Sequence, residues 1–423
     1  MSSLTRRKFL ALSGVGAAGA VTAFGTRFAF AAPGSPETGD TIVAIFLRGG
    51  ADGLSIAAPY DYPSYRQLRP NIALPPPGAN LGALPLNSAS SPTAAFPTGI
   101  EGVLGLNPGL QPIYDTLWTA GKLAVLPATG MPASESSTRS HFEAETFVGR
   151  GSASSSVGGG WLGRMLNVMN PAGVIAGVNT SQRQNLLQGG RNTAAVPDLG
   201  QFGITGFRDR DRATTALTML NSGADSVSTE GQQVLTTVER IQQLDQNANN
   251  EGFPNSGIGR DLAQVSTLLK AELGLQAAAI DVGGWDTHGG QGNAGDTNGR
   301  FYQLMDELGS ALRAFADDTN QLEEVTVVVV TEFGRTINEN GNRGTDHGRA
   351  ATYLAMGAGI QGGVFGDDYP DAIQDGPEGD LAVLTDFRKP MSEIVLKRAG
   401  VNSVDTVFPT YEGTGELGLA MPS

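Results

Sequence analysis

The chain has 423 residues, with 59 Gly, 23 Pro, 3 His and no Cys, and its formal net charge at pH 7 is −14. Without cysteine there is no disulfide, thiolate metal site or thiol nucleophile, so any catalyst must use hydroxyls, imidazoles, carboxylates or a metal. The acidic balance argues against nucleic-acid or anionic-membrane partners, because both require a basic face. The Gly and Pro content indicates a globular chain with many turns.

The first 31 residues are typical of an export signal. Residues 5–10 (TRRKFL) are basic, residues 11–25 are mildly apolar and rich in Gly and Ala, and residues 29–31 (AFA) form a small-x-small cleavage site. The paired arginines resemble a twin-arginine signal, which is recognised by the twin-arginine translocase and implies a periplasmic or secreted protein. An N-terminal membrane anchor is the alternative, but a span needs about 20 strongly apolar residues. We therefore expect residues 32–423 to form the mature chain, with no stable membrane span after cleavage.

An alternation of strands and helices begins directly after this segment. Residues 41–47 (TIVAIFL) are an uninterrupted apolar run, which is typical of a strand buried on both faces, and a Gly-rich turn containing Asp52 follows it. Residues 70–108 are rich in Pro, Gly and Asn, and are expected to form a long loop.

The next helix and strand have clear boundaries. Asn107 and Pro108 supply a cap and a first-turn proline for a helix over 110–120, Gly121 ends it, and residues 123–126 (LAVL) form a strand. The result is a strand–helix–strand unit.

A Gly- and Ser-rich tract at 151–160 separates this unit from a middle segment. Residues 161–275 contain long loops and a polar helix near 230–247, and we expect this segment to be an inserted cap.

The strand and helix alternation resumes after the insertion. Residues 276–280 and 325–330 are apolar strand patterns, and apolar residues recur every three or four positions over 301–315, which indicates one buried helix face. This alternation predicts one α/β domain over 32–423 with a mostly parallel central sheet and helices on both faces.

The three histidines and several acids follow the predicted strands or lie in short Gly-bounded turns. They are His141, His288, His347, Asp52, Asp286 and Glu332. In parallel sheets ligands bind beyond the carboxyl ends of the strands, so we expect these side chains to share one rim. A mixed imidazole and carboxylate set suits Zn, Mn, Ca or Mg, which predicts a divalent metal site.

Each motif alone also has a simpler structural interpretation. Asp286 with His288 is compatible with an Asx-turn and a solvated imidazole. Asp52, which precedes a glycine, is likewise compatible with a simple turn. Ser140 and Glu143 match a capping box, which predicts that a helix begins there. The metal hypothesis therefore depends on the motifs acting together.

Several stretches together resemble an exported bacterial family known as domain of unknown function 1501, with similarity over about residues 40 to 400. They are residues 47–54 (LRGGADGL), 104–108 (LGLNP), 139–142 (RSHF), 283–288 (GGWDTH), 331–335 (TEFGR), 344–348 (GTDHG) and 386–388 (DFR). Members commonly carry a twin-arginine signal. The resemblance implies an alkaline phosphatase-like fold, from a superfamily of phosphatases, sulfatases and phosphate mutases, and fold transfers better than function.

The resemblance also implies roles for individual residues. Asp52 resembles the acid that binds metal after the first strand, and Asp286, His288 and His347 resemble the ligands of one metal, with Asp346 as an adjacent acid.

A hydroxyl turn supplies the implied nucleophile. Ser137 precedes His141 by four residues, which is similar to the nucleophile–histidine spacing of cofactor-independent phosphoglycerate mutases, and Ser136 and Thr138 are competitors.

One position departs from the superfamily pattern. Glu332 stands where an Asp followed by His is usual, but Phe333 follows it, so one imidazole ligand is missing. A two-metal site is therefore in doubt, whereas a single-metal site, or one completed by Asp346 or His141, is compatible with the sequence.

Two functions follow as hypotheses. The first is an exported metal-dependent hydrolase of phosphate or sulfate esters, in which Arg139 or Arg335 holds the anion of a small ester or an exported polymer. The second is a non-catalytic binding or scaffold protein on a degenerate fold, which the absent imidazole favours.

Overall fold

The structure is a computed structural model that describes residues 39–423, apart from residues 98, 172, 174, 182–184, 204–208, 245–250, 294, 367–378, 414 and 423. The predicted export signal at 1–31 lies outside the described residues. Among the residues described, no helix is both long and apolar enough to cross a bilayer.

A mostly parallel sheet forms the centre of the molecule. Its strands are β1 (Thr41–Leu47), β5 (Leu123–Gly130), β6 (Gly177–Asn179), β7 (Thr193–Ala195), β8 (Ala277–Val282), β9 (Val325–Thr331), β10 (Ala351–Met356), β11 (Gly363–Val364) and β12 (Thr385–Asp386). The spatial order is β11-β5-β10-β9-β1-β8-β6-β7, and β12 pairs with β5. Within this described sheet β1 is parallel to both β8 and β9, whereas β10 is antiparallel to β5 and β9. The predicted sheet is confirmed.

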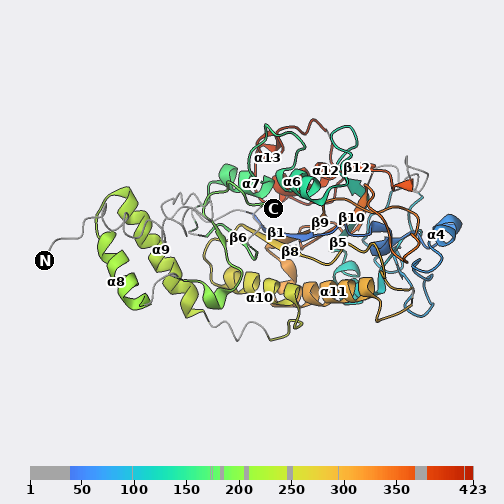
Figure 1. Cartoon of the computed structure of the whole chain (residues 1–423), viewed down its shortest axis with the longest axis horizontal. Coiled ribbons are helices and arrows are strands. Elements are labelled where there is room, and N and C mark those ends of the chain that lie inside the picture. The colour runs from blue at the N-terminus through green and yellow to red at the C-terminus, as the bar shows by residue number, and fades with distance from the viewer. Residues whose placement is uncertain are drawn as a thin grey trace.

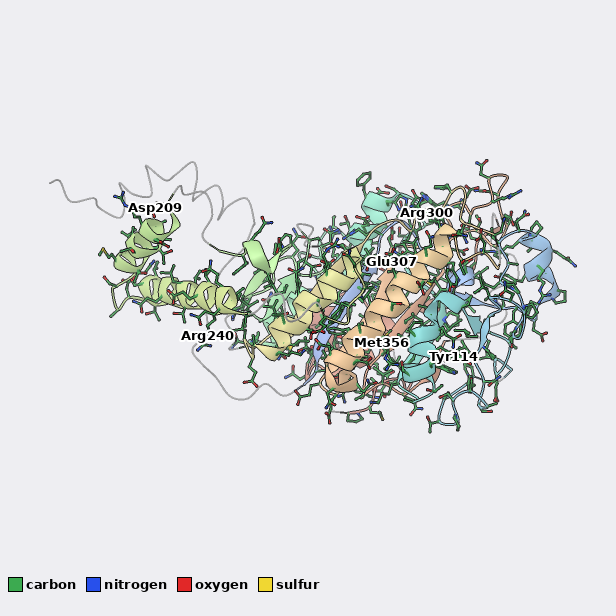
Figure 2. The ribbon with its side chains drawn as sticks, turned by 90° about the horizontal axis from the view of Figure 1, so that it is seen from below. Tyr114, Asp209, Arg240, Arg300, Glu307 and Met356 are labelled. Atoms are coloured by element: carbon green, nitrogen blue, oxygen red, sulfur yellow. The ribbon has the colours of Figure 1, made fainter. Side chains whose placement is uncertain are left out.

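Helices cover both faces of this sheet, as Figure 1 shows. One layer holds α10 (Gly257–Lys270) and α11 (Arg300–Asp318), and the other holds α6 (His141–Arg150), α7 (Trp161–Met169), α12 (Arg388–Lys397) and α13 (Val404–Val407). Figure 2 shows α10 and α11 side by side across one face. The predicted arrangement of helices on both faces is therefore confirmed.

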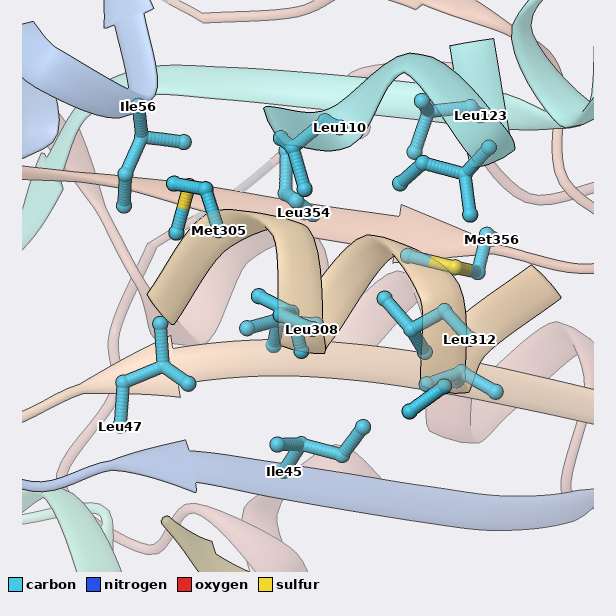
Figure 3. Packing of buried hydrophobic residues seen from close by; sticks show 14 of the residues in the cluster. Ile45, Leu47, Ile56, Leu110, Leu123, Met305, Leu308, Leu312, Leu354 and Met356 are labelled. Atoms are coloured by element: carbon cyan, nitrogen blue, oxygen red, sulfur yellow. The ribbon is translucent and has the colours of Figure 1, made fainter. Parts of the chain in front are cut away.

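The apolar run of β1 serves both layers at once. Ile45 and Leu47 face α11, where they pack with Met305, Leu308 and Leu312, as Figure 3 shows. The alternate side chains of β1 belong to the core on the other face of the sheet. Because side chains alternate along a strand, only a continuous apolar run can fill two cores.

The segment between β1 and β5 is less regular than expected. The predicted helix over 110–120 is divided into η1 (Pro108–Leu110), α5 (Gln111–Ile113) and a π-helical η2 (Tyr114–Trp118). Prolines remove backbone donors at 108 and 112, which prevents a continuous α-helical ladder. The side chain of Asn107 caps η1, as predicted, by accepting a hydrogen bond from the amide of Gly109.

The expected loop over 70–108 contains strands of a small second sheet. It consists of β2 (Ala57–Ala58), β3 (Leu84–Pro85) and β4 (Gly105–Leu106), and the short helices α3 (Gly53–Ile56) and α4 (Pro63–Leu68) precede or follow β2.

The predicted insertion over 161–275 is only in part a separate unit. Strands β6 and β7 extend the central sheet, and α7 and α10 belong to the helical layers. The helices α8 (Arg210–Leu220) and α9 (Ser226–Gln243) pack on each other and extend away from the sheet, as Asp209 and Arg240 mark in Figure 2. The correction arises because β6 and β7 are three-residue strands, too short to give a periodic signal.

Candidate metal centre

The loops that carry the candidate residues meet at one rim of the sheet. Strands β1, β5, β8 and β9 run in the same direction, so their carboxyl ends meet there. Strand β10 runs the opposite way, so the segment that precedes it, with His347, reaches the same rim. Antiparallel pairing of β10 between β5 and β9 therefore places His347 beside residues that follow the other strands.

Three side chains at this rim form a compact donor group. His141, Asp286 and His347 each offer one ligand atom within 4.8 Å of the others. Nε2 of His141 lies 3.6 Å from Oδ2 of Asp286, and Nε2 of His347 lies 3.5 Å from Oδ1. Sequence reasoning placed His141 among the catalytic residues and as an alternative ligand, and the structure places it in the donor group.

His288 adds a further nitrogen to this group. Its Nε2 lies 2.9 Å from Nε2 of His347 and 3.3 Å from Oδ1 of Asp286. Neighbouring ligand atoms on a tetrahedral ion with bonds of about 2 Å are separated by about 3.3 Å. His288 lies at a comparable separation from Asp286 and His347, whereas the compact group that can share one small divalent ion is His141, Asp286 and His347.

The opposite nitrogen of each imidazole is bound to an acceptor. Nδ1 of His141 lies 2.8 Å from Glu332, Nδ1 of His288 lies 3.1 Å from Asp346, and Nδ1 of His347 lies 2.9 Å from a backbone carbonyl. Because carboxylates and carbonyls only accept, each Nδ1 carries the proton. In the neutral rings each Nε2 then keeps a lone pair directed at Asp286, which is the arrangement seen for metal-ligating histidines.

Imidazole nitrogens without a satisfactory hydrogen-bond partner also indicate a metal site. Among the described residues, Nε2 of His141 is a buried atom without a hydrogen-bond partner. The nearby Nε2 atoms of His288 and His347 lie 2.9 Å apart, and two lone pairs at that distance repel unless a proton lies between them or a metal cation binds both. A bound divalent ion would satisfy all three nitrogens.

Glu332 lies behind His141 and does not reach the donor group. Its Oε1 also accepts from the amide of Gly49 at 2.8 Å, and its side chain is 2% exposed. Burial alone would raise the pKa of Glu332, but the hydrogen bonds from His141 and from backbone amides hold its pKa below the usual value. Its anionic form orients His141, so the structure supports an orienting role for Glu332.

Gly49 is required where the first loop approaches Asp286. Its φ is +122°, and a Cβ added there would lie 2.3 Å from the amide nitrogen of Asp286. A side chain would therefore both strain the backbone and displace a candidate ligand.

The guanidinium of Arg335 holds Asp286 from the other side. It is buried, donates to Oδ1 of Asp286 at 2.6 Å, and binds the carbonyls of Gly50 and Thr345. Burial would raise the pKa of Asp286, but the bond from Arg335 lowers it below the ordinary value. Arg335 was predicted to hold a substrate anion, and the structure shows its donors engaged in fixing the site.

The imidazoles differ in how easily they are protonated. The hydrogen bond to Glu332 raises the pKa of His141 above its ordinary value, although burial opposes this. Burial, with the nearby charge of Arg335, lowers the pKa of His347. His347 is therefore neutral and able to bind a metal at a lower pH than His141.

Asp52 lies outside the donor group, contrary to the predicted ligand role. Its carboxylate is 1% exposed and forms two hydrogen bonds with Arg69, of 2.6 and 3.0 Å. Ser55 and Gln291 donate to the same carboxylate at 2.6 and 2.8 Å. Burial would raise the pKa of Asp52, but the charge of Arg69 lowers it. These donors use the oxygens that a metal would need, so Asp52 serves as a structural anchor beneath the first loop.

Asp346 supports His288 from outside the donor group. The Oδ1 atom of Asp346 accepts a hydrogen bond from Nδ1 of His288. The same oxygen also accepts one from the side-chain amide nitrogen of Asn340 at 3.1 Å. The hydrogen bond from His288 is the main cause that lowers the pKa of Asp346.

The hydroxyl turn lies beside the centre, across Phe333. The ring of Phe333 packs 4.9 Å from that of His141 and 4.8 Å from that of His347, where the superfamily pattern expects another imidazole. Ser137 is exposed and lines a cavity that Phe333 also borders. No hydrogen bond links Ser137 to the donor group among the described residues.

The start of α6 differs from the predicted capping box. Ser140 is the N-cap, as expected, but its side chain makes no capping bond. Thr138 instead donates to Glu143 at 2.6 Å and accepts from the amide of Ser140. Arg139 donates to the buried Asp380 at 2.6 Å and is about one third exposed.

Sequence reasoning missed Arg69, Asp380 and Arg349, which support the loops around the site. Arg69 and Asp380 lie in segments without a recognisable motif, and Arg349 follows a motif that does not include it. The partner of each is distant in the chain, as with Arg349 and Asp380, 3.6 Å apart. No local pattern could have identified these pairs.

Comparisons with known proteins agree with the predicted family. A family model described as protein of unknown function (DUF1501) matches residues 127–375, which include all three histidines, Asp286 and Glu332. No curated protein matches the chain.

Solved structures resemble the fold at low sequence identity. The C-terminal periplasmic domain of EcEptC from Escherichia coli, in complex with Zn, is 10% identical, with 92% of each chain covered and a TM-score of 0.37. The PsFucS1 sulfatase from Pseudoalteromonas sp. is 11% identical, with 84% of this chain and 67% of that chain covered and a TM-score of 0.32. Alkaline phosphatase from the Antarctic bacterium TAB5 is 9% identical, with 78% and 95% covered and a TM-score of 0.30. Since the family model covers more than half of the chain, the protein belongs to the DUF1501 family.

Proposed function

We propose that this protein is an exported metal-dependent hydrolase of phosphate or sulfate esters, acting on a small anionic ester or an exported polymer. The proposal is carried by one observation: the Nε2 atoms of three imidazoles lie 3.3, 3.5 and 3.6 Å from the carboxylate of Asp286, and an acceptor holds Nδ1 of each. A divalent ion such as Zn, Mn, Ca or Mg, held by these four side chains, would supply Lewis acidity and neutralise charge on the ester.

The protein's own side chains would prepare the site for that ion. Asp286 and His288 are about half exposed, so the centre is open to a substrate from solvent. Arg335 and Glu332 fix Asp286 and His141 in place before any ligand arrives. Preorganised charges cost little reorganisation when the substrate reacts.

Ser137 is the proposed nucleophile, with Ser136 and Thr138 as competitors. All three line the cavity beside Phe333, and Ser137 is the exposed one. Single Ala variants at the three positions should separate them, because only the nucleophile's loss should abolish turnover while metal content stays unchanged.

The first test is elemental analysis of the purified chain, followed by hydrolysis of aryl phosphate and aryl sulfate with each of the four metals. We expect about one ion per chain, and loss of both ion and turnover in His347→Ala and Asp286→Asn. Glu307→Gln, an exposed change on α11, is the matched control. A chain without metal whose activity is unchanged in His347→Ala would contradict the proposal.

A second function is favoured by the number of protein donors. Four protein ligands around one ion are typical of a closed structural site, whereas catalytic sites usually keep one position open. A scaffold protein with a structural ion would bind metal and lose stability in His347→Ala, but would hydrolyse neither class of ester.

The export route is proposed from the N-terminal sequence. Replacing Arg6 and Arg7 by Lys should retain the chain in the cytoplasm, because the twin-arginine translocase reads this pair. Fractionation of cells that express the two forms tests the proposal, and equal export of both would contradict it.

A further inference from the structure

A cavity lies directly beside the metal centre, on the side of α6. Its empty volume is ≈ 330 Å³.

 

The cavity of ≈ 330 Å³ is the one that carries this inference, because it adjoins the metal centre through two shared residues. Glu332 and Phe333 line it, and both also contact His141. A group bound in the cavity would therefore lie next to an ion held by His141.

The wall of this cavity has an apolar side and a polar side. The apolar side chains are Met131, Ala144, Phe147, Val148 and Phe333, and the polar ones are Ser136, Ser137, Thr138, Glu332 and Arg349. The carboxylate of Glu332 is already engaged by His141, Gly49 and Thr331. The polar groups left for a ligand are hydroxyls and a guanidinium, which are hydrogen-bond donors that suit an anion.

Arg349 is the charged residue of the cavity wall that can donate hydrogen bonds to a bound anion. Its Nε is buried without a hydrogen-bond partner among the described residues, and the carboxylate of Asp380, with which it forms an ion pair, lies 3.6 Å away. Asp380 also accepts from Arg139 at 2.6 Å, so this acid is shared between two guanidiniums, and the Arg349 side chain, which is 26% exposed, can bind an oxyanion in the cavity.

The hydroxyl turn is held in place before any ligand binds. Arg388 is 2% exposed and donates to Glu135, at the start of this turn. The same guanidinium binds Asp386 at 2.6 Å. This anchoring limits the entropy that the turn would lose on binding an anion.

We propose that this cavity binds the tetrahedral oxyanion of an alkyl or aryl phosphate or sulfate monoester, with Arg349 as the residue that selects the anion. The oxyanion contacts Arg349 and the hydroxyls, and the apolar substituent lies against Phe147. This inference rests on the proposed function, because it names the substrate class of the same site. It replaces Arg335, whose donors are engaged, as the predicted anion-binding arginine.

Calorimetric titration of the full chain with inorganic phosphate, sulfate and phenyl phosphate tests the proposal, with metal removed and with metal restored. We expect Arg349→Met to weaken binding of each anion by about 10- to 100-fold, since a charged hydrogen bond is lost. Arg349→Lys should fall between this variant and the wild type. Arg313→Met, a partly exposed change on α11 that also removes an ion-paired guanidinium, is the matched control and should bind as the wild type does.

The apolar side has its own test. Phe147→Ala should weaken phenyl phosphate several-fold and leave inorganic phosphate unchanged. Unchanged binding in Arg349→Met, equal weakening in Arg313→Met, or no anion binding by the wild type would overturn the inference. Anion binding that depends on Arg349 in a chain that hydrolyses no ester would support the inference and contradict the proposed function alone.

Discussion

Oε1 of Glu332 lies 2.8 Å from Nδ1 of His141 and 2.8 Å from the amide nitrogen of Gly49. One buried carboxylate thereby joins the loop after β9 to the loop after β1 and to the first residue of α6. Its charge keeps the proton of His141 on Nδ1, which leaves Nε2 directed at Asp286. Metal affinity should therefore depend on a residue that is not itself a ligand.

We expect Glu332→Gln to lower metal affinity by about 10- to 100-fold, the range found for residues that orient metal-ligating histidines. The neutral amide can still accept from His141, but it no longer stabilises that orientation by charge. Competition with a chromophoric chelator measures the affinity. Glu307→Gln serves as the control, and an unchanged affinity in Glu332→Gln would show that the ion does not use His141.

The sequence could predict that the candidate site residues lie close together, because their proximity follows from the direction of the strands. Asp286 and Glu332 follow apolar runs that were recognisable as strands, and parallel strands bring such positions to one rim. His347 precedes β10, a strand that sequence reasoning did not identify, and it reaches the rim because β10 is antiparallel.

The division of roles within the site could not be predicted in the same way. Asp52, Asp286 and Glu332 have the same chemistry and similar positions after strands. What distinguishes them is the partner that folding supplies: Arg69 for Asp52, Arg335 for Asp286 and His141 for Glu332. Arg69 lies beyond a short helix and carries no motif, so the ion pair that engages Asp52 had no sequence signal.

The ion pair of Asp52 and Arg69 predicts a large effect on stability. Arg69→Met leaves a buried carboxylate without its cation, and we expect a loss of about 3–5 kcal/mol in the free energy of unfolding. Urea denaturation measures the loss. Arg66→Met, an exposed change in α4 just before Arg69, should change stability by less than about 0.5 kcal/mol.

A double variant separates charge from packing at this pair. Asp52→Asn combined with Arg69→Met removes both charges, so it should be more stable than Arg69→Met alone. Its metal content should equal that of the wild type, because Asp52 lies outside the donor group. Loss of the ion in a folded double variant would restore Asp52 as a ligand.

The core between the sheet and α11 predicts that two Leu→Ala substitutions on α11 lower the stability of the fold by different amounts. Leu308 is 1% exposed and packs between α11 and β1, as Figure 3 shows, whereas Leu304 on the same helix is only partly buried. Leu308→Ala should cost about 2–5 kcal/mol, because it leaves a cavity among side chains that cannot collapse fully. Leu304→Ala should cost clearly less, and equal costs in urea denaturation would contradict the packing described.

A pH-dependent effect on stability is expected at Asp261, on α10. Burial raises the pKa of Asp261 from 3.8 to about 6, and the nearby charge of Asp281 acts in the same direction. Between these two pH values the folded chain binds more protons at this residue than the unfolded chain does. Its contribution to stability therefore falls as pH rises from about 4 to 6, and the full penalty remains above that range.

Asp261→Asn removes the penalty, so it should stabilise the fold at pH 7.5 by about 1–2 kcal/mol and have little effect near pH 4. Urea denaturation at the two pH values measures the difference. Asp306→Asn, an exposed change on α11, should shift stability equally at both. A gain in Asp261→Asn that is the same at pH 4 and pH 7.5 would contradict this prediction, because it would mean that burial does not raise the pKa of Asp261 in the folded chain.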